Sequence, residues 1–367
     1  MSSERAYWLA WSQITGIGPV LLQRLQQYFG TLAAAWYADV RELKQVEGFG
    51  VQTIAAVNAG RSQLHPEQLL LTHQQQNLHF WTPVDFDYPQ LLLEIPSPPP
   101  VLYYRGDVDL QENLGQKPLV SIVGTRNPSE YGQRWTRKLS TILTKNGFTI
   151  VSGLADGIDT EAHHSCLAAG GRTIAVLGTG VDVVYPSRNQ NLYQQILDQG
   201  LVVSEYPAKT PPDRAHFPRR NRIIAGLTRA VLVLEAPTRS GALITAHFAN
   251  EFCRDVYALP GSLDNPRSLG CLELIHKGAG VILGEDSLLE MLGSMPQIDQ
   301  TQLSSATQLS LAPELEKVFQ AIAAESVSFD LIVQQTGYLA SQVSSALLQL
   351  ELLGLVTQLP GMRYQRC

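Results

Sequence analysis

The sequence predicts an α/β protein built on a doubly wound parallel β-sheet, and three stretches carry that prediction. Leu119–Val123 is apolar or β-branched apart from one serine, which is typical of a buried strand, and Gly124 follows it directly. A helix is expected to begin at Ser129, so that a strand, a glycine and a helix N-terminus come in order, an arrangement that offers backbone amides to a phosphate group. Phe148–Gly153 and Arg172–Gly178 repeat this order. Strands and helices that alternate in this way form parallel sheets.

The alternation continues to about residue 293, so 119–293 is expected to form one domain with seven strands. The four remaining strand patterns are 201–206, 230–236, 255–261 and 281–284. The helical patterns are 131–146, 158–169, 189–199, 218–227, 241–253 and 270–277. Since the carboxyl ends of parallel strands lie at one edge, the loops that follow them are expected to carry the function.

Two smaller domains are expected to flank this core. Residues 1–80 show helical patterns, whereas 81–118 contains seven prolines and predicts an extended connector. Val101–Arg105 is compatible with a short strand at the sheet edge. Residues 294–312 are polar and without pattern, which indicates a linker. Residues 313–367 predict three helices followed by a β-hairpin, an order that resembles a winged helix.

Both flanking domains contain features that occur in DNA-binding proteins. The glycine turns at 14–19 and 46–50 resemble helix-hairpin-helix motifs, but tight helix–helix turns are favoured because few cations lie nearby. The third helix expected in the C-terminal domain, within 339–352, contains neither Lys nor Arg. A protein contact is therefore expected of that helix rather than an entry into a DNA groove.

Composition excludes several classes of protein. The chain has 367 residues, 44% of them hydrophobic, and a formal charge of −6, and no apolar run is long enough to cross a membrane. The N-terminus lacks the layout of a signal peptide, so a cytoplasmic location is expected. The four cysteines are scattered without zinc-finger spacing. Asp156, Asp159, His163 and His164 form too weak a pattern for a metal site, and helix capping by Asp156 is favoured. No metal or cofactor is predicted.

Basic residues concentrate in the loop after the fourth strand. Residues 209–229 contain six Lys and Arg residues against one Asp. Pro218 suits the first turn of a helix, and Arg219, Arg220 and Arg222 fall beside it. Because cations oppose the helix dipole there, an anionic ligand is expected. The alternative is that these arginines pair with internal carboxylates such as Glu205 and Glu235.

Two further loops at the same edge suit an anion. Arg126 follows the first strand, and Arg239–His247 contains a glycine and opens a helix after the fifth strand. Tyr185, Tyr206 and Phe217 fall beside this rim and offer faces on which bases can stack. Together these observations predict a site for phosphate groups and nucleobases.

The motifs along the core resemble those of the DprA/Smf DNA-processing family. They are Ile122–Arg126, Ser152–Asp159, Thr173–Gly180, Ser204–Pro207, Phe217–Leu227, Ser240–Ala246 and Leu259–Gly261. The resemblance implies a Rossmann-like core, a sterile-alpha-motif-like head and a winged-helix tail. It also implies that the protein binds single-stranded DNA, forms a homodimer and hands the strand to RecA during natural transformation.

The three loops and the resemblance together define the expected site residues. Arg126, Arg220, Asn221 and Arg222 match family motifs, whereas His247 stands where a lysine is frequent. The expected DNA-binding residues are Gly124, Thr125, Arg126, Ser152, Gly153, Lys209, Phe217, Arg219, Arg220, Asn221, Arg222, Arg239, Ser240, Gly241 and His247. The family's dimer surface corresponds to 269–283, with Leu272, Ile275 and Val281 as contact residues.

An enzyme and an interaction scaffold are the alternatives. Nucleotide phosphoribohydrolases have a similar core, but residues 240–247 lack the acid that their catalytic segment carries. No G-x-G-x-x-G follows the first strand, which argues against a dinucleotide oxidoreductase, and no G-x-x-x-x-G-K-[ST] occurs, which argues against an ATPase. A scaffold that contacts DNA only incidentally remains the third possibility. No catalytic residue is predicted.

Overall fold

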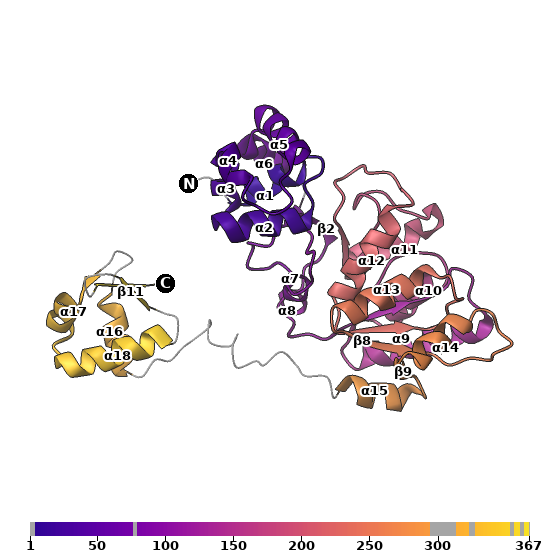
Figure 1. Cartoon of the computed structure of the whole chain (residues 1–367). Coiled ribbons are helices and arrows are strands. Elements are labelled where there is room, and N and C mark those ends of the chain that lie inside the picture. Colours follow the sequence, from indigo (N-terminus) through magenta and orange to yellow (C-terminus); the bar gives the residue numbers. More distant parts are fainter. Residues whose placement is uncertain are drawn as a thin grey trace. The chain divides into compact units, whose positions relative to one another are not determined.

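The computed structural model describes residues 4–75, 79–293, 313–322, 327–352, 356–359 and 363–366 (Figure 1). It divides into two compact units, residues 1–298 and 299–367. The linker predicted at 294–312 lies outside the described residues. Among the helices that are described, none has the length and apolar character needed to span a membrane.

The first residues form a small helical domain. Its helices are α1 (Glu4–Ser12), α2 (Pro19–Phe29), α3 (Leu32–Tyr37), α4 (Val40–Leu43), α5 (Val51–Gln63) and α6 (Pro66–Gln75). Trp8, Trp11 and Trp36 lie in its core. Gly18 and Gly50, from the two glycine turns, are the N-caps of α2 and α5. Arg24 forms a salt bridge of 3.3 Å with Glu47 beside the second turn, so this cation is already paired.

A nine-stranded sheet forms the core, and it consists of the seven predicted strands and two further strands, β1 and β2, at one edge. Its order is β1-β2-β6-β5-β4-β3-β7-β8-β9. The seven strands from β3 onward are parallel to their neighbours, whereas β2 pairs antiparallel with β6 and β1 pairs antiparallel with β2. The strands are β1 (His79–Trp81), β2 (Leu102–Gly106), β3 (Leu119–Val123), β4 (Thr149–Ser152), β5 (Thr173–Val176), β6 (Leu201–Ser204), β7 (Ala230–Val233), β8 (Asp255–Ala258) and β9 (Gly280–Val281).

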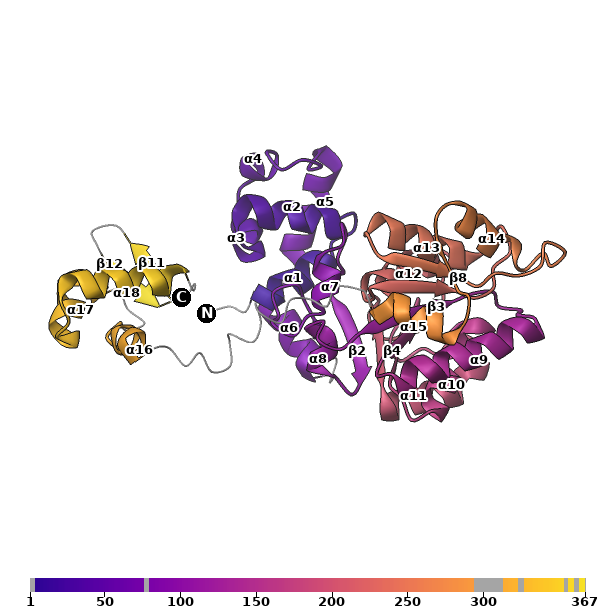
Figure 2. The ribbon, with the colours of Figure 1, turned by 90° about the horizontal axis from the view of Figure 1, so that it is seen from below.

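Helices cover both faces of this sheet, because alternate residues of each strand point to opposite sides (Figure 2). Leu119 and Val123 pack on one side, and Val120 and Ile122 on the other. The first face is covered by α7 (Gln90–Leu93), α12 (His216–Gly226), α13 (Gly241–Glu251) and α14 (Leu269–His276). The second is covered by α9 (Glu130–Lys145), α10 (Ile158–Ala168), α11 (Gln190–Gln199) and α15 (Glu285–Gly293).

The structure adds elements that the sequence patterns did not predict. Residues 79–81, at the predicted boundary between the helical domain and the connector, form β1. The proline-rich connector also contains α7 and α8 (Leu110–Asn113) as well as the edge strand. A buried carboxylate anchors this connector, since Glu112 accepts hydrogen bonds from Thr149 of β4 and from Arg172, which directly precedes β5. The last strand is shorter than predicted, and the helix α15 follows it where none was expected.

The C-terminal unit is a winged helix. It contains α16 (Pro313–Gln320), β10 (Val327–Ser328), α17 (Phe329–Thr336), α18 (Ala340–Leu352), β11 (Val356–Leu359) and β12 (Arg363–Arg366). Its strands form a small sheet in the order β10-β12-β11, and β11 pairs antiparallel with β12 as the predicted hairpin requires. The tip of that hairpin lies outside the described residues.

Candidate functional site

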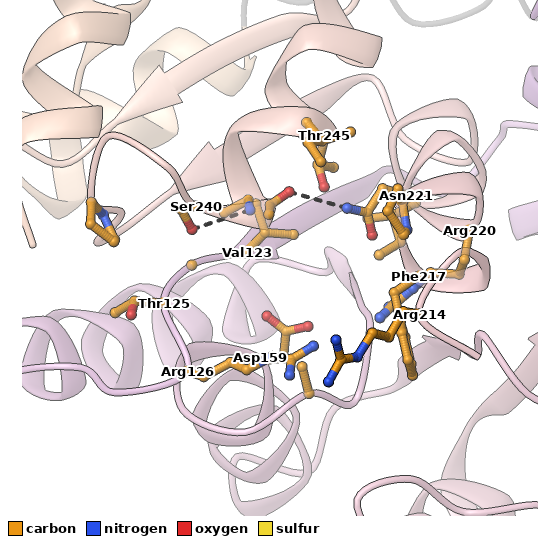
Figure 3. A pocket seen from close by; sticks show the side chains of 18 of the residues that line it. Val123, Thr125, Arg126, Asp159, Arg214, Phe217, Arg220, Asn221, Ser240 and Thr245 are labelled. Carbon is orange, nitrogen blue, oxygen red and sulfur yellow. Dashed lines mark hydrogen bonds between the residues drawn. The ribbon is translucent and has the colours of Figure 1, made fainter. Parts of the chain in front are cut away.

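A cavity of about 630 Å³ lies at the carboxyl ends of β3, β4 and β7 (Figure 3). From β3 the chain continues to β4 on one side, whereas its other neighbour, β7, comes much later in the sequence. The cavity therefore lies at the topological switch point, where doubly wound sheets bind ligands. Its lining residues are Val123, Gly124, Thr125, Arg126, Ala155, Asp159, Tyr185, Arg214, Phe217, Pro218, Arg220, Asn221, Ile224, Pro237, Ser240, Gly241, Ala242, Ile244 and Thr245.

The loop after β3 is held firmly in place. The Thr125 amide donates to the Glu235 carbonyl oxygen at 2.6 Å, and the Thr125 carbonyl oxygen accepts from the Ile158 amide at 3.2 Å. A Cβ atom at Gly124 would come within 2.5 Å of the Ile158 side chain, so only glycine fits there. The exposed Arg126 follows this rigid loop, and its guanidinium carbon lies 5.9 Å from the centre of the Phe217 ring.

The N-terminus of α9 does not serve as the phosphate site that the strand–glycine–helix order predicts. The Glu235 carboxylate occupies it, accepting hydrogen bonds from the Ser129 amide at 2.7 Å and from the Ser129 hydroxyl at 2.6 Å. Glu235 is 1% exposed. Because a carboxylate of the protein already compensates this helix end, that part of the prediction is wrong. Ser240 and Gly241, at the N-terminus of α13, do line the cavity.

Arg220 is the most unusual residue of the cavity wall. It is 4% exposed, and its Nη1 donates to the Val176 carbonyl oxygen at 2.9 Å. Its Nε is buried without a hydrogen-bond partner, and no carboxylate forms an ion pair with it in the part of the chain that the structure describes. Burial lowers the pKa of Arg220 to about 10, and Asp159 attracts the charge from the same wall. The guanidinium is thus a buried cation with only partial compensation.

Asp159 adds an acid that the sequence analysis assigned to no role in the cavity. Its carboxylate accepts a hydrogen bond from the Gly153 amide at 3.1 Å, and burial raises its pKa. The predicted capping by Asp156 is wrong, because Gly157 caps α10 and Asp156 instead pairs with Arg188 at 2.6 Å. His163 bonds to Thr173 in the core. No cluster of metal ligands is found among the described residues.

The basic segment 209–222 divides into cavity residues and structural residues. Arg214 lines the cavity, although it was not among the expected site residues. Arg222 does not line it, because its Nη2 forms a salt bridge of 2.6 Å with Glu205 and the side chain is buried. For this arginine the alternative of an internal carboxylate is the one that the geometry supports. Lys209 and Arg219 are exposed outside the lining.

Two aromatic rings border the cavity, and a third does not. Tyr185 is 42% exposed, and its ring centroid lies 5.4 Å from that of Phe217. Both residues line the cavity, as expected of stacking faces. Tyr206 instead stacks on His216 at 3.9 Å and does not reach the lining.

Eight of the expected site residues therefore lie together around the cavity, and the others do not line it. The eight are Gly124, Thr125, Arg126, Phe217, Arg220, Asn221, Ser240 and Gly241. Ser152 is buried and donates to the Ile122 carbonyl oxygen, while Arg239 and His247 are exposed outside the lining. His247 lies 3.3 Å from Glu251. Gly153 contributes indirectly, since a Cβ atom there would fall 1.5 Å from the Arg220 Nη1.

Fold and cavity together define a Rossmann-like protein with an arginine-lined cavity at its switch point. Residues 79–293 match the family model of DNA recombination-mediator protein A, and residues 302–362 match the DprA winged helix domain. Protein Smf of Synechocystis sp. is 53% identical over 395 residues, covering 100% of this chain and 99% of that protein. The chain therefore belongs to the DNA processing protein A family, also called DprA/Smf.

Solved structures agree with this assignment. The X-ray structure of DNA processing protein A from Streptococcus pneumoniae has a TM-score of 0.68 and 36% identity, and the match covers 79% of this chain and 98% of that one. The same protein from Helicobacter pylori, described for its single-stranded DNA binding mode, has a TM-score of 0.52 and 31% identity. That match covers 59% of this chain and 95% of the other.

The contact between Gly153 and Arg220 can be tested by adding one methyl group. Gly153→Ala places a Cβ atom where the guanidinium lies, so the free energy of unfolding should fall by about 1–3 kcal/mol. Gly241→Ala is the matched control, because a Cβ atom there would meet nothing within 4 Å. Urea denaturation of both variants measures the effect. Equal stability of the two variants would show that Arg220 is not confined by Gly153.

Proposed function

We propose that this protein binds single-stranded DNA in the cavity at the switch point. The observation that carries the proposal is the buried Arg220, whose charge is compensated only in part. A buried cation without an ion-pair partner is unfavourable, whereas a phosphate group in the cavity would supply the missing charge and accept hydrogen bonds. The proposal thus explains why an arginine is buried at this place.

The remaining lining residues suit a nucleotide strand rather than an isolated anion. Arg126 and Arg214 provide exposed guanidinium groups, and Tyr185 and Phe217 provide ring faces beside them. Cations that track a backbone, combined with rings on which bases stack, are the usual means of binding single strands. The similar protein from Helicobacter pylori is described as binding single-stranded DNA, which supports the same ligand here.

Membership of the family supports the wider role. We propose that the bound strand is delivered to RecA during natural transformation or another recombination process in the cytoplasm. The relatives from Streptococcus pneumoniae and Bacillus subtilis are named DNA processing proteins. RecA filament assembly on oligonucleotides coated with a single-strand-binding protein, with and without this protein, tests the delivery step. An unchanged assembly rate would contradict it.

We also propose that the protein is a homodimer that pairs along the β9 edge of the sheet. β9 is the last strand in the sheet order, and Leu283 beside it is 77% exposed. Leu272, Ile275 and Val281 are half-buried, and Ile275 packs against the core of its own chain. Leu283 is therefore better placed than Ile275 to contact a partner.

If the cavity arginines contact phosphate groups, their replacement should weaken DNA binding more than replacement of an arginine outside the cavity. Arg126→Ala should weaken binding of single-stranded DNA by about 1.5–3 kcal/mol, because a charged hydrogen-bond donor is lost from the cavity. Arg239→Ala, an exposed arginine outside the lining, should leave the affinity nearly unchanged. Fluorescence anisotropy with an oligonucleotide measures both. Equal losses for the two variants would place the site elsewhere.

Arg222→Ala separates structural loss from loss of a ligand contact. Its removal leaves the largely buried Glu205 without its partner, so the free energy of unfolding should fall by about 3–5 kcal/mol. The protein that remains folded at low temperature should bind single-stranded DNA normally. Thermal unfolding and anisotropy on the same preparation measure the two effects. Unchanged stability combined with weak binding would make Arg222 a direct contact after all.

The nucleotide hydrolase remains the alternative because Asp159 provides a carboxylate in the cavity. We expect no base release from AMP, since the Gly153 amide and the charge of Arg220 hold this carboxylate in the wall. Chromatography of AMP incubated with the protein checks this expectation. Release at enzyme-like turnover that disappears in Asp159→Asn would establish an enzyme.

Leu283→Glu tests the dimer without disturbing the core. Because the side chain is exposed, the variant should fold normally and sediment as a monomer, while the parent protein sediments as a dimer. Val51→Glu, at an 83% exposed position of the helical domain, controls for the added charge. A Leu283→Glu protein that remains dimeric would exclude this edge.

A further inference from the structure

The outer face of α9 carries a row of basic residues that the cavity does not use. Arg134, Arg137, Lys138 and Lys145 are all exposed, and their spacing places them along one side of the helix. The opposite side, with Gly132, Thr136, Leu139, Ser140 and Leu143, is buried. We call the four exposed cations, together with Thr141 between them, the α9 ridge.

The composition of the ridge differs from that of an ordinary solvent-exposed face. After Glu130, α9 contains no acidic residue, although the whole chain has a formal charge of −6. Soluble helices normally intersperse both signs of charge, and like charges three or four residues apart destabilise a helix. Within the described part of the chain, Arg137 is the one ridge cation with an acidic partner, Glu161 of α10, at 3.1 Å. An external anion along this row would relieve the repulsion between its cations.

The ridge has shape as well as charge. A hollow of about 340 Å³ is lined by Arg137, Lys138, Thr141, Ile142, Lys145 and Glu285, of which only Glu285 is acidic. Two cations of the α9 ridge lie over aromatic rings. The guanidinium carbon of Arg134 is 5.7 Å from the centre of the Tyr131 ring, and the Lys138 Nζ is 5.2 Å from the centre of the Trp135 ring. Arginine and lysine beside rings suit a nucleic-acid strand better than an acidic peptide, which offers no bases.

The position of α9 connects the ridge to the cavity. The helix begins at Glu130, four residues after Arg126 of the cavity wall, and its axis from Arg134 to Lys145 spans about 16 Å. A nucleic-acid strand carries a phosphate about every 3.4 Å in the B form, so several charges fit along that length. The first residues of the helix and the cavity are joined through Glu235, which bonds to both Ser129 and Thr125.

We propose that the α9 ridge is a second nucleic-acid contact, on which single-stranded DNA continues after it leaves the cavity. This inference rests on the proposed function, since it extends the path of the same strand. It predicts that the ridge contributes to binding of long strands and not to binding of short ones, which the cavity alone can hold.

The experiment compares two lengths of oligothymidylate. The short one, of about six nucleotides, is within the range of site sizes known for single-strand-binding domains, and the long one, of about twenty, exceeds that range. The variant is Lys138→Gln/Lys145→Gln in the full chain. The matched control is Arg41→Gln/Lys44→Gln, which removes two exposed cations from the helical domain. Anisotropy titrations at several salt concentrations give the affinity and the salt slope.

For the ridge variant, the dissociation constant of the long oligonucleotide should rise about tenfold, and its salt slope should become shallower by about 1.4 because two phosphate contacts are lost. The short oligonucleotide should bind as it does to the parent protein, and the control should change neither. The proposal is overturned if the long strand binds normally, if both lengths weaken equally, or if the control shows the same loss. Failure of the parent protein to bind the short strand would instead contradict the proposed function.

Discussion

The burial of the Arg220 guanidinium is the constraint on which the site depends. It requires a glycine at 153, a carbonyl oxygen at the end of β5 and a carboxylate at 159. Gly153 and Asp159 follow β4 and Val176 ends β5, whereas Arg220 itself lies in α12 after β6, so the parallel sheet must align these segments before the arginine can be accommodated. Because they compensate the charge only in part, the same arrangement that holds Arg220 leaves it able to attract an anion.

A second carboxylate limits where the proposed anion can bind. Glu235 closes the N-terminus of α9, the position at which many Rossmann-like proteins hold a diphosphate, and its own carbonyl oxygen fixes the loop before Arg126. The positively charged groups that still face the cavity at the switch point are the arginine side chains and the N-terminus of α13. The site is therefore displaced from the usual cofactor position towards the basic segment at 214–221, which favours a strand passing through over an enclosed dinucleotide.

Much of the fold could be predicted from the sequence, because buried parallel strands such as Leu119–Val123 are apolar and end in glycine. The short elements could not: β1 has three residues, and α7 and α8 have four each, too few to show a period. For the site, the sequence shows where the arginines occur, but it does not show which hydrogen-bond or ion-pair partners they have. Arg220 and Arg222 are neighbours of identical chemistry, yet one faces the cavity and the other pairs with Glu205. Which of the two arginines faces the cavity depends on the direction in which each points from α12 and on the position of Glu205 after β6, and neither can be read from the sequence.

The central claim is that the cavity is a phosphate site for single strands, and the salt dependence of binding tests it most directly. Three cavity arginines should give a slope of log affinity against log salt of about −2 for a single strand of about six nucleotides, at about −0.7 per neutralised phosphate. A duplex of the same sequence should bind more weakly, because its bases are not free to stack on Tyr185 and Phe217. Binding that does not depend on salt, or a duplex that binds as tightly as the single strand, would contradict the account.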